Sequence, residues 1–235
     1  MDKAPIFLHD PDESHRFIIF DMFGTLVRSR QRDMEDLYQV FFKLFPERTP
    51  EEVSEEYHRF YSYFNETHMR HSEMSIIHLI DHLNEVFGTE VDPLEAEEAM
   101  MRGTRMFIPI EGAEDTLRYF KDHGYRIGVL SNTAYRSTVV KGVLEDIAFE
   151  GIIDAVVTSA EVGYKKPSDM AYSAALKSIG AEKQYCFFAG DSCDKDCRGP
   201  LEFGFKGAFL IDPVHCGKRR NIVSKIGDIP SLFQE

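Results

Sequence analysis

The chain has 235 residues, 43% of them hydrophobic, and a net charge of −13 at neutral pH. The acidic surplus excludes the basic surface with which proteins bind nucleic acid, and it disfavours binding to anionic membranes. This length and composition are enough for one sizeable α/β domain, or for one domain with a smaller one inserted.

The N-terminal segment is polar, and the cysteines lie towards the C-terminus. Residues 1–16 lack the apolar stretch of a secretory signal, so we expect them to form a mobile leader of a cytoplasmic protein. No apolar stretch approaches the length needed to cross a bilayer. The four cysteines lie in the last quarter of the chain and are expected to be reduced thiols: Cys186, Cys193, Cys197 and Cys216. A zinc site made by Cys193, Cys197, His215 and Cys216 is the alternative, but their spacing matches no common zinc motif.

The first predicted element is a short strand over residues 17–20, Phe-Ile-Ile-Phe. An apolar run of this length, bounded by Asp21 and Gly24, is typical of a strand buried on both faces of a parallel sheet. Ligands of such sheets bind beyond the carboxyl ends of the strands. Asp21 is therefore predicted to be a reactive carboxylate, and the alternative is that it only caps a turn.

The chain from about Asp33 to Phe107 is predicted to be helical, with no strand. The predicted helices are marked by an apolar stripe over 37–45, a capping box at 49–52, an apolar run over 76–87 that ends at Gly88, and a second capping signal at 92–95. Four amphipathic helices with short connections indicate a small bundle of their own. We assign residues 29–107 to this inserted helical block.

Strands and helices alternate after Pro109. Strands are predicted over 126–131, 153–157, 185–191 and 206–211, and helices over 113–121, 137–147, 168–180 and 197–203. Such alternation implies right-handed crossovers and a parallel sheet covered by helices on both faces. The predicted fold class is therefore α/β, with a Rossmann-like core formed by residues 17–28 and 108–235.

Polar side chains follow the ends of several predicted strands or lie in the loops beyond them. They are Asp21, Ser131 with Asn132, Lys166 before Pro167, and Asp191 with Ser192 and Asp196. Carboxylates that meet at one edge of a sheet are costly to hold close unless a cation binds, and a set of oxygen ligands suits Mg²⁺. Ser131 and Lys166 would hold an anion, which leaves one carboxylate free to act as a nucleophile.

These motifs, in this order and spacing, resemble those of the haloacid dehalogenase superfamily. The matching stretches are Asp21-Met22-Phe23-Gly24-Thr25, Val129-Leu130-Ser131-Asn132, Gly163 to Pro167 with Lys166 in register, and Gly190-Asp191-Ser192 through Asp196 to Gly199. The resemblance covers nearly the whole chain from Phe17. The block over 29–107 resembles the helical cap of the first type, which that superfamily inserts between its first and second motifs.

The resemblance implies a Mg²⁺-dependent hydrolase of a small phosphorylated metabolite, in which Asp21 attacks phosphorus and forms an aspartyl phosphate. It implies that Mg²⁺ is held by Asp21, the backbone carbonyl of Phe23 and Asp191, while Asp196 positions metal-bound water or pairs with Lys166. It also implies that the phosphoryl oxygens are held by Ser131, Asn132 through its backbone, Lys166 and Thr25. It leaves the oligomeric state open.

Phe23 departs from the phosphatase pattern. Phosphatases of the superfamily carry a second aspartate two residues after the nucleophile, which protonates the leaving group. Dehalogenases carry an aromatic residue there, so the alternative is a 2-haloacid dehalogenase in which Asp21 displaces halide from carbon. Dehalogenases need no metal and lack the Gly190-Asp191 pair that this chain keeps, which favours phosphoryl chemistry. A third alternative is a phosphate-binding protein with weakened turnover.

Charged side chains of the helical block and its ends offer two further hypotheses. In the first hypothesis, one histidine of the block replaces the missing acid. The candidates are His58, His68, His71, His78 and His82, and the favoured interpretation is that they occupy solvated positions on helices. Four arginines near the ends of the block would reach an anionic substrate, although surface salt bridges are favoured for them: Arg28, Arg30, Arg102 and Arg105.

Overall fold

The computed structural model describes residues 16–31, 34–68, 71–215 and 221–233. The predicted leader, apart from Arg16, lies outside the described residues, and so does Cys216 of the zinc alternative. A six-stranded parallel sheet forms the centre of the molecule in the order β5-β4-β1-β6-β7-β8. Its strands are β1 (Phe17–Phe20), β4 (Arg126–Ser131), β5 (Ala155–Thr158), β6 (Cys186–Gly190), β7 (Gly207–Ile211) and β8 (Ile222–Val223). The parallel sheet is confirmed, and β8 is an addition to it.

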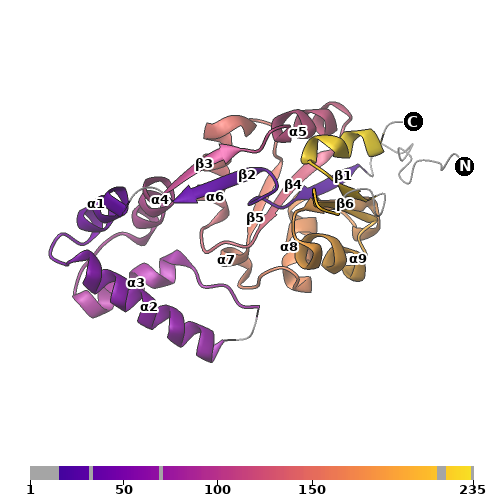
Figure 1. The fold of residues 1–235 in the computed structure, drawn as a ribbon. Coiled ribbons are helices and arrows are strands. Elements are labelled where there is room, and N and C mark those ends of the chain that lie inside the picture. The colour runs from indigo at the N-terminus through magenta and orange to yellow at the C-terminus, as the bar shows by residue number, and fades with distance from the viewer. Residues whose placement is uncertain (1–15, 32–33, 69–70, 216–220, 234–235) are drawn as a thin grey trace, which may run out of the picture.

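Helices cover both faces of this sheet, as the sequence predicts (Figure 1). They are α5 (Ala113–Asp122), α6 (Ser137–Leu144), α7 (Ser159–Val162), α8 (Asp169–Ile179) and α9 (Gly199–Phe203). In β1, Ile18 and Phe20 join one buried cluster with residues of α5 and α6. Phe17 and Ile19 join a second cluster with residues of α8. The four-residue apolar run is therefore buried on both faces, because alternate side chains of a strand point to opposite sides.

A block of four helices lies to one side of the sheet (Figure 1). Its members are α1 (Met34–Leu44), α2 (Pro50–Thr67), α3 (Ile76–Phe87) and α4 (Pro93–Thr104). The three helix ends predicted from capping residues are confirmed. Thr49 forms the capping box of α2, Gly88 ends α3 with φ +67°, and Asp92 caps α4. The block has a buried cluster of its own. Among the helices described, none combines the length and apolar character that crossing a bilayer requires.

Two strands connect the block to the core, and the prediction of no strand up to Phe107 is wrong. β2 (Val27–Gln31) and β3 (Arg105–Pro109) pair antiparallel and form a second, two-stranded sheet. Most of their side chains are exposed or half-buried, so they lack the apolar run that marks a core strand. Their partner is distant in the sequence, and only the fold brings it near. The assigned limits of the block fall inside this ladder, where Arg28 pairs with Ile108 and Ser29 with Phe107.

Candidate functional site

The site lies where the strand order changes direction along the chain. β1 is flanked by β4 and β6, so Asp21 at the end of β1 has Ser131 at the end of one neighbour and Asp191 beyond the other. The Asp21 backbone N–H donates to the Ala189 carbonyl at 2.8 Å, which continues the ladder to the reactive position. Ligand sites of open α/β sheets form at such switch points.

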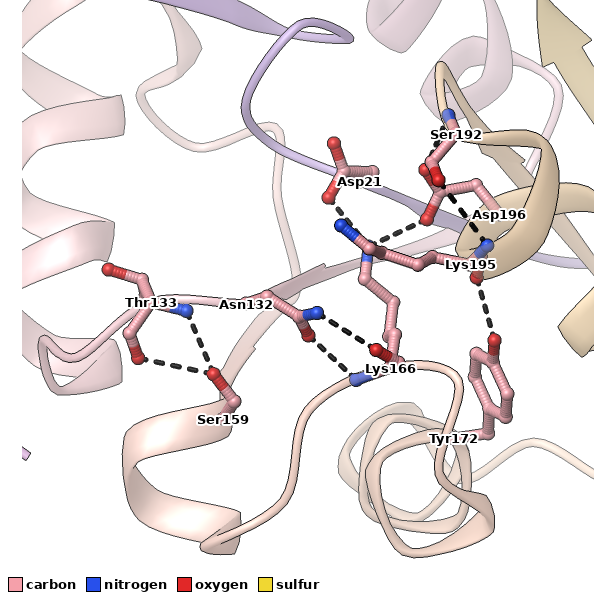
Figure 2. Close-up of polar contacts among 9 residues, drawn as sticks. All are labelled: Asp21, Asn132, Thr133, Ser159, Lys166, Tyr172, Ser192, Lys195 and Asp196. Atoms are coloured by element: carbon pink, nitrogen blue, oxygen red, sulfur yellow. Dashed lines mark hydrogen bonds and ion pairs between the residues drawn. The ribbon is translucent and has the colours of Figure 1, made fainter. Parts of the chain in front are cut away.

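Lys166 connects two buried carboxylates (Figure 2). Its Nζ donates to Asp21 Oδ1 at 2.6 Å and to Asp196 Oδ1 at 2.8 Å. The other oxygen of Asp196, Oδ2, accepts the Ser192 backbone N–H at 2.9 Å. Asp196 comes from a π-helical segment over Cys193–Arg198, and Lys166 from the loop before α8. Three segments that are distant in the sequence are thus fixed against each other by charge-assisted hydrogen bonds.

Asn132 fixes the backbone on both sides of the Lys166 side chain (Figure 2). Its Oδ1 accepts the Lys166 N–H at 2.7 Å, and its Nδ2 donates to the Lys166 carbonyl at 3.0 Å. The Tyr172 hydroxyl donates to the Lys195 carbonyl at 2.7 Å and supports the segment that carries Asp196. The Asn132 amide therefore positions Lys166, and the expected contact with a phosphoryl group would fall to the Asn132 backbone.

Three carboxylates converge at this edge, those of Asp21, Asp191 and Asp196. Each offers an oxygen, and these atoms lie within 4.8 Å of one another. Gly24 makes the approach possible: its φ is +83°, and a Cβ placed there would lie 2.1 Å from Asp191 Oδ2. Only glycine meets both conditions without strain. Phe23, which precedes it, is half-buried, and its ring packs at 6.3 Å from that of Phe107.

Burial raises the pKa of Asp21 to about 6; Lys166 opposes this effect, and the charges of Asp196 and Asp191 add to it. Burial alone would lower the pKa of Lys166, but the two carboxylates that it contacts raise it, so Lys166 stays protonated. Burial, followed by the charge of Asp196, raises the pKa of Asp191. The charges of Lys166 and Lys195 oppose this effect at Asp191. The three carboxylates still outnumber these two lysines, and the excess of negative oxygen ligands fits a hard divalent cation such as Mg²⁺.

Two buried hydroxyls beside the cluster have no hydrogen-bond partner among the described residues. They are those of Thr25 and Ser131, both fully buried. An unsatisfied buried hydroxyl costs about 1–3 kcal/mol, so such groups mark a place where a ligand oxygen is expected. Thr158, which pairs with Ser131 across β4 and β5, has the same property. Sequence reasoning missed Thr158, since no polar motif surrounds it.

The helical block contacts the core beside the site through the segment over 71–76. The Ser159 hydroxyl donates to Glu73 Oε2 at 2.7 Å, and Lys165 Nζ lies 3.3 Å from Glu73 Oε1. Backbone hydrogen bonds add to this contact: Lys165 to His71, Glu73 to Gly163, and Ile76 to Ala134. Farther away, the buried Glu97 of α4 accepts from the backbone N–H and the Nε of Arg136 at 2.6 and 2.5 Å. Sequence reasoning missed Glu73 and Glu97, because neither lies in a recognisable motif.

A pocket of about 360 Å³ lies between the block and the core. Phe23 and Asn132 line it from the core side, and Tyr57, Tyr61 and Arg105 from the side of the block and its connecting strands. Of the four arginines singled out from the sequence, Arg105 therefore lines this pocket. Arg102 instead pairs with Glu98 and Asp146, and Arg28 and Arg30 are exposed.

The described histidines of the block do not line this pocket. His58 lines a neighbouring hollow and His71 a separate surface pocket. His82 contacts Glu56 at 2.8 Å, His68 stacks on Phe64, and His78 is exposed. This structure therefore provides no support for a histidine in place of the missing acid.

The model of one protein family, the haloacid dehalogenase-like hydrolases, matches residues 15–204. The chain belongs to this family. A human relative, haloacid dehalogenase-like hydrolase domain-containing protein 3, is 32% identical over 52% of this chain and 48% of its own length. Glyceraldehyde 3-phosphate phosphatase of Methanothermobacter thermautotrophicus is 30% identical over 51% of each chain. This chain thus spans about half the length of these two relatives.

Solved structures show the same fold in members of this hydrolase family with different chemistry. A 2-haloacid dehalogenase from Pseudomonas syringae aligns with a TM-score of 0.63 at 15% identity, over 92% of this chain and 97% of its own. A phosphatase from Thermococcus onnurineus aligns with a TM-score of 0.56 at 17% identity, over the same shares. At these identities the likeness concerns the fold alone, and the reaction has to be inferred from the site.

Proposed function

We propose that this hydrolase is a Mg²⁺-dependent phosphatase that acts on a small phosphorylated metabolite. The observation that carries the proposal is the convergence of the Asp21, Asp191 and Asp196 carboxylates, two of which, Asp21 and Asp196, contact Lys166. A dehalogenase needs a carboxylate nucleophile but no cation, whereas this cluster has two further carboxylates that a cation would neutralise. Relatives support the same reaction, since they include a glyceraldehyde 3-phosphate phosphatase and a ribulose-1,5-bisphosphate 5-phosphatase.

In this proposal Asp21 is the nucleophile, and one of its carboxylate oxygens attacks phosphorus to form an aspartyl phosphate. Lys166 holds the carboxylate in place and neutralises charge that develops on the phosphoryl oxygens. The free hydroxyls of Ser131 and Thr25 donate to those oxygens. Mg²⁺, held by Asp21, the Phe23 carbonyl and Asp191 with Asp196 close by, would supply Lewis-acid stabilisation of the phosphoryl group. Water then cleaves the acyl phosphate and restores Asp21.

Residues 29–107 are proposed to act as a cap on the core formed by 17–28 and 108–235. The pocket between them is lined from both sides, and Glu73 and Glu97 tie the block to the core. A cap of this kind excludes water from the nucleophile and selects the leaving group. Substrate choice would then depend on residues of the block rather than on the strand ends.

One observation favours a second candidate, a 2-haloacid dehalogenase. Phe23 places an aromatic ring where a phosphatase of this family carries an acid, and this ring packs against Phe107. In that reaction Asp21 would displace halide from carbon, and no metal would be needed.

A direct screen separates the candidates. Acetyl phosphate, 4-nitrophenyl phosphate and 2-chloropropionate are each incubated with the protein, with Mg²⁺ or with EDTA. We expect release of phosphate that requires Mg²⁺, together with a mass increase of one phosphoryl group on the peptide containing Asp21 after an acid quench. Release of chloride in EDTA, without phosphate release, would replace the proposal by the second candidate. Inactivity on all three, with no labelled peptide, would refute both.

A further inference from the structure

A hollow of about 570 Å³ opens among the helices of the block. Each of its four helices supplies an apolar wall residue: Phe41 of α1, Val53 of α2, Leu79 of α3 and Met100 of α4. Protein interiors are close-packed, and voids larger than a water molecule are few. A space of this size among apolar side chains is therefore a candidate binding site for an apolar group.

This hollow adjoins the pocket that Phe23 and Asn132 line at the strand ends. Four residues line both spaces: Tyr57, Ile76, Arg105 and Tyr135. The two spaces are therefore neighbours, separated by the side chains that line both of them. The far rim of the hollow is polar, with Glu51 and Ser54 of α2 among its residues.

Aromatic rings line the pocket at the strand ends. We use the name aromatic collar for Phe23, Tyr57, Tyr61 and Tyr135, which all line the pocket at the strand ends. Tyr57 and Tyr61 are stacked, with ring centroids 6.0 Å apart and planes 15° from parallel. Flat apolar surfaces of this kind favour a planar aromatic ligand, because rings gain from offset and edge contacts beyond simple burial.

The same pocket lacks an effective acid among the described residues that line it. The Glu73 carboxylate is engaged by the Ser159 hydroxyl and by Lys165. Tyrosine is a poor acid at neutral pH, and burial raises the pKa of Tyr135 to about 12. Arg105 is permanently charged. A leaving group here has to depart as a stabilised anion, which a phenolate does far more readily than an alkoxide.

Resting on the proposed phosphatase function, we propose that the substrates are aryl phosphomonoesters that carry an apolar substituent. The ring lies in the aromatic collar and the substituent fills the hollow of the helical block. Two observations support the same class of substrate. The absent acid favours a phenolate, which is a good leaving group, and the apolar hollow favours an apolar substituent on its ring.

The reaction balances without an acid in the pocket. An oxygen of Asp21 forms a bond to phosphorus, and the bond from phosphorus to the phenolic oxygen breaks with its electron pair on oxygen. The phenolate takes a proton from solvent after it leaves. Water then adds to the phosphorus of the aspartyl phosphate, the Asp21 oxygen leaves, and inorganic phosphate is released.

The first test is a substrate series with Mg²⁺: phenyl phosphate, 4-butylphenyl phosphate and glycerol 3-phosphate. Each buried methylene is worth about a four-fold change, so we expect kcat/KM for the butylphenyl ester to exceed that for phenyl phosphate on the order of 100-fold. Glycerol 3-phosphate should be the poorest of the three. Equal kcat/KM for the two aryl esters would overturn the inference while the phosphatase function stands.

The second test fills the hollow. Val53→Phe places a ring where Val53, 1% exposed, lines the wall, and Val86→Phe makes the same change at an α3 position that is 48% exposed. We expect Val53→Phe to remove the advantage of the butyl group, so that the ratio of kcat/KM for 4-butylphenyl phosphate to kcat/KM for phenyl phosphate falls to about one. Val86→Phe should keep the wild-type ratio. The same ratio in both variants would overturn the inference.

A binding measurement keeps the inference testable if turnover is absent. Calorimetry with 4-butylphenylphosphonate and phenylphosphonate, in the presence of Mg²⁺, needs no chemistry at Asp21. We expect tighter binding of the butyl compound to the wild type and to Val86→Phe, and no difference between the two ligands in Val53→Phe. Tighter binding without hydrolysis would support the hollow as a ligand site and refute the phosphatase function. Equal binding by the wild type would refute the inference.

Discussion

The strand-end site and the hollow of the helical block differ in how their space is filled. At the strand ends, Lys166 contacts two carboxylates, and the Asn132 amide uses both its donor and its acceptor on one residue. In the block, about 570 Å³ is left between apolar side chains of all four helices. In the proposed reaction, the first arrangement holds the attacking carboxylate in one geometry, because charge-assisted hydrogen bonds fix these groups against one another. The second arrangement would distinguish ligands by their size and polarity, because apolar walls favour any apolar group that fits the space.

The difference has a consequence for substitution. A substitution at the strand ends removes one partner of a buried ion pair and leaves the other charge buried without a partner. It should therefore lower both the turnover and the free energy of unfolding by a large amount. A change in the hollow alters contact area, and its effect is small and confined to some ligands.

Asp21→Asn should abolish turnover, with a loss on the order of 10⁴-fold in kcat, since the attacking charge is removed while the shape is kept. Hydrolysis of 4-nitrophenyl phosphate with Mg²⁺ measures it. Asp194→Asn is the matched control, because Asp194 lies in the same region but is exposed and pairs with Arg198. Turnover of Asp21→Asn near the wild-type rate would show that the nucleophile is elsewhere.

Lys166→Met should lower the free energy of unfolding by about 3–5 kcal/mol at pH 8, because two buried carboxylates lose their partner. Urea unfolding measures the change. Lys165→Met provides the comparison, since Lys165 is more exposed and its pair with Glu73 is worth about 0–1 kcal/mol. Similar losses in the two variants would contradict the account of a buried, charge-dependent site.

The metal-free protein should become less stable as the pH rises from 4 to 6. The folded pKa of Asp21, about 6, lies above the ordinary value of 3.8, so the folded state binds this proton more tightly than the unfolded state. Stability from this group is present below pH 4 and is lost as the pH rises through 6, on the order of 3 kcal/mol in total. Urea unfolding in EDTA across this range measures it, and Asp21→Asn should remove this part of the slope.

The same titration predicts how Mg²⁺ acts. A carboxylate has to lose its proton before it binds a metal, so the proton and Mg²⁺ compete for Asp21. The increase in melting temperature caused by Mg²⁺ should be larger at pH 8 than at pH 5. An increase that does not depend on pH would place the ion away from Asp21.

Phe23→Asp should raise the ratio of alkyl to aryl phosphate turnover, by at least about ten-fold and up to about 10²-fold, because it supplies a general acid. Rates on glycerol 3-phosphate and phenyl phosphate give the ratio. Phe23→Leu is the control, since it removes the same ring of the aromatic collar without adding an acid, and the rise of the ratio in Phe23→Asp should exceed the change in Phe23→Leu. No rise in Phe23→Asp, in a variant that still hydrolyses phenyl phosphate, would show that the missing acid does not limit the reaction.

Much of the fold is predictable from local sequence. The run Phe17–Phe20 specifies a strand buried on both faces, and Thr49, Gly88 and Asp92 mark helix ends because their side chains or backbones satisfy specific end positions. The strand ends then bring Asp21 and Asp191 to one edge as a consequence of parallel pairing. All of these signals act within a few residues or follow from the sheet as a whole.

The remaining features depend on distant partners. β2 and β3 are too polar to be recognised as strands, and each becomes a strand because the other is present. Glu97 contacts Arg136 only because α4 packs near α6, so the spacing of the two residues in the sequence does not predict this ion pair. The hollow depends on how four helices are held apart, and a list of their apolar residues contains no information about the volume between them.

The pairing of Arg28 with Ile108 has a consequence for the history and the engineering of this chain. The backbone leaves the core and returns to it at neighbouring points, so the intervening segment can be exchanged without rethreading the central sheet. Domain insertions succeed at positions of this kind, where the two ends of the inserted piece are close together. A two-residue turn inserted between Arg28 and Ile108 would replace the block and join β2 to β3 as a hairpin. The order of β1, β4 and β6 in the central sheet would not change. Under the proposed function, the reaction centre and the block that selects the substrate are separable parts, and grafting a different block onto the same two strands is a route to a new specificity.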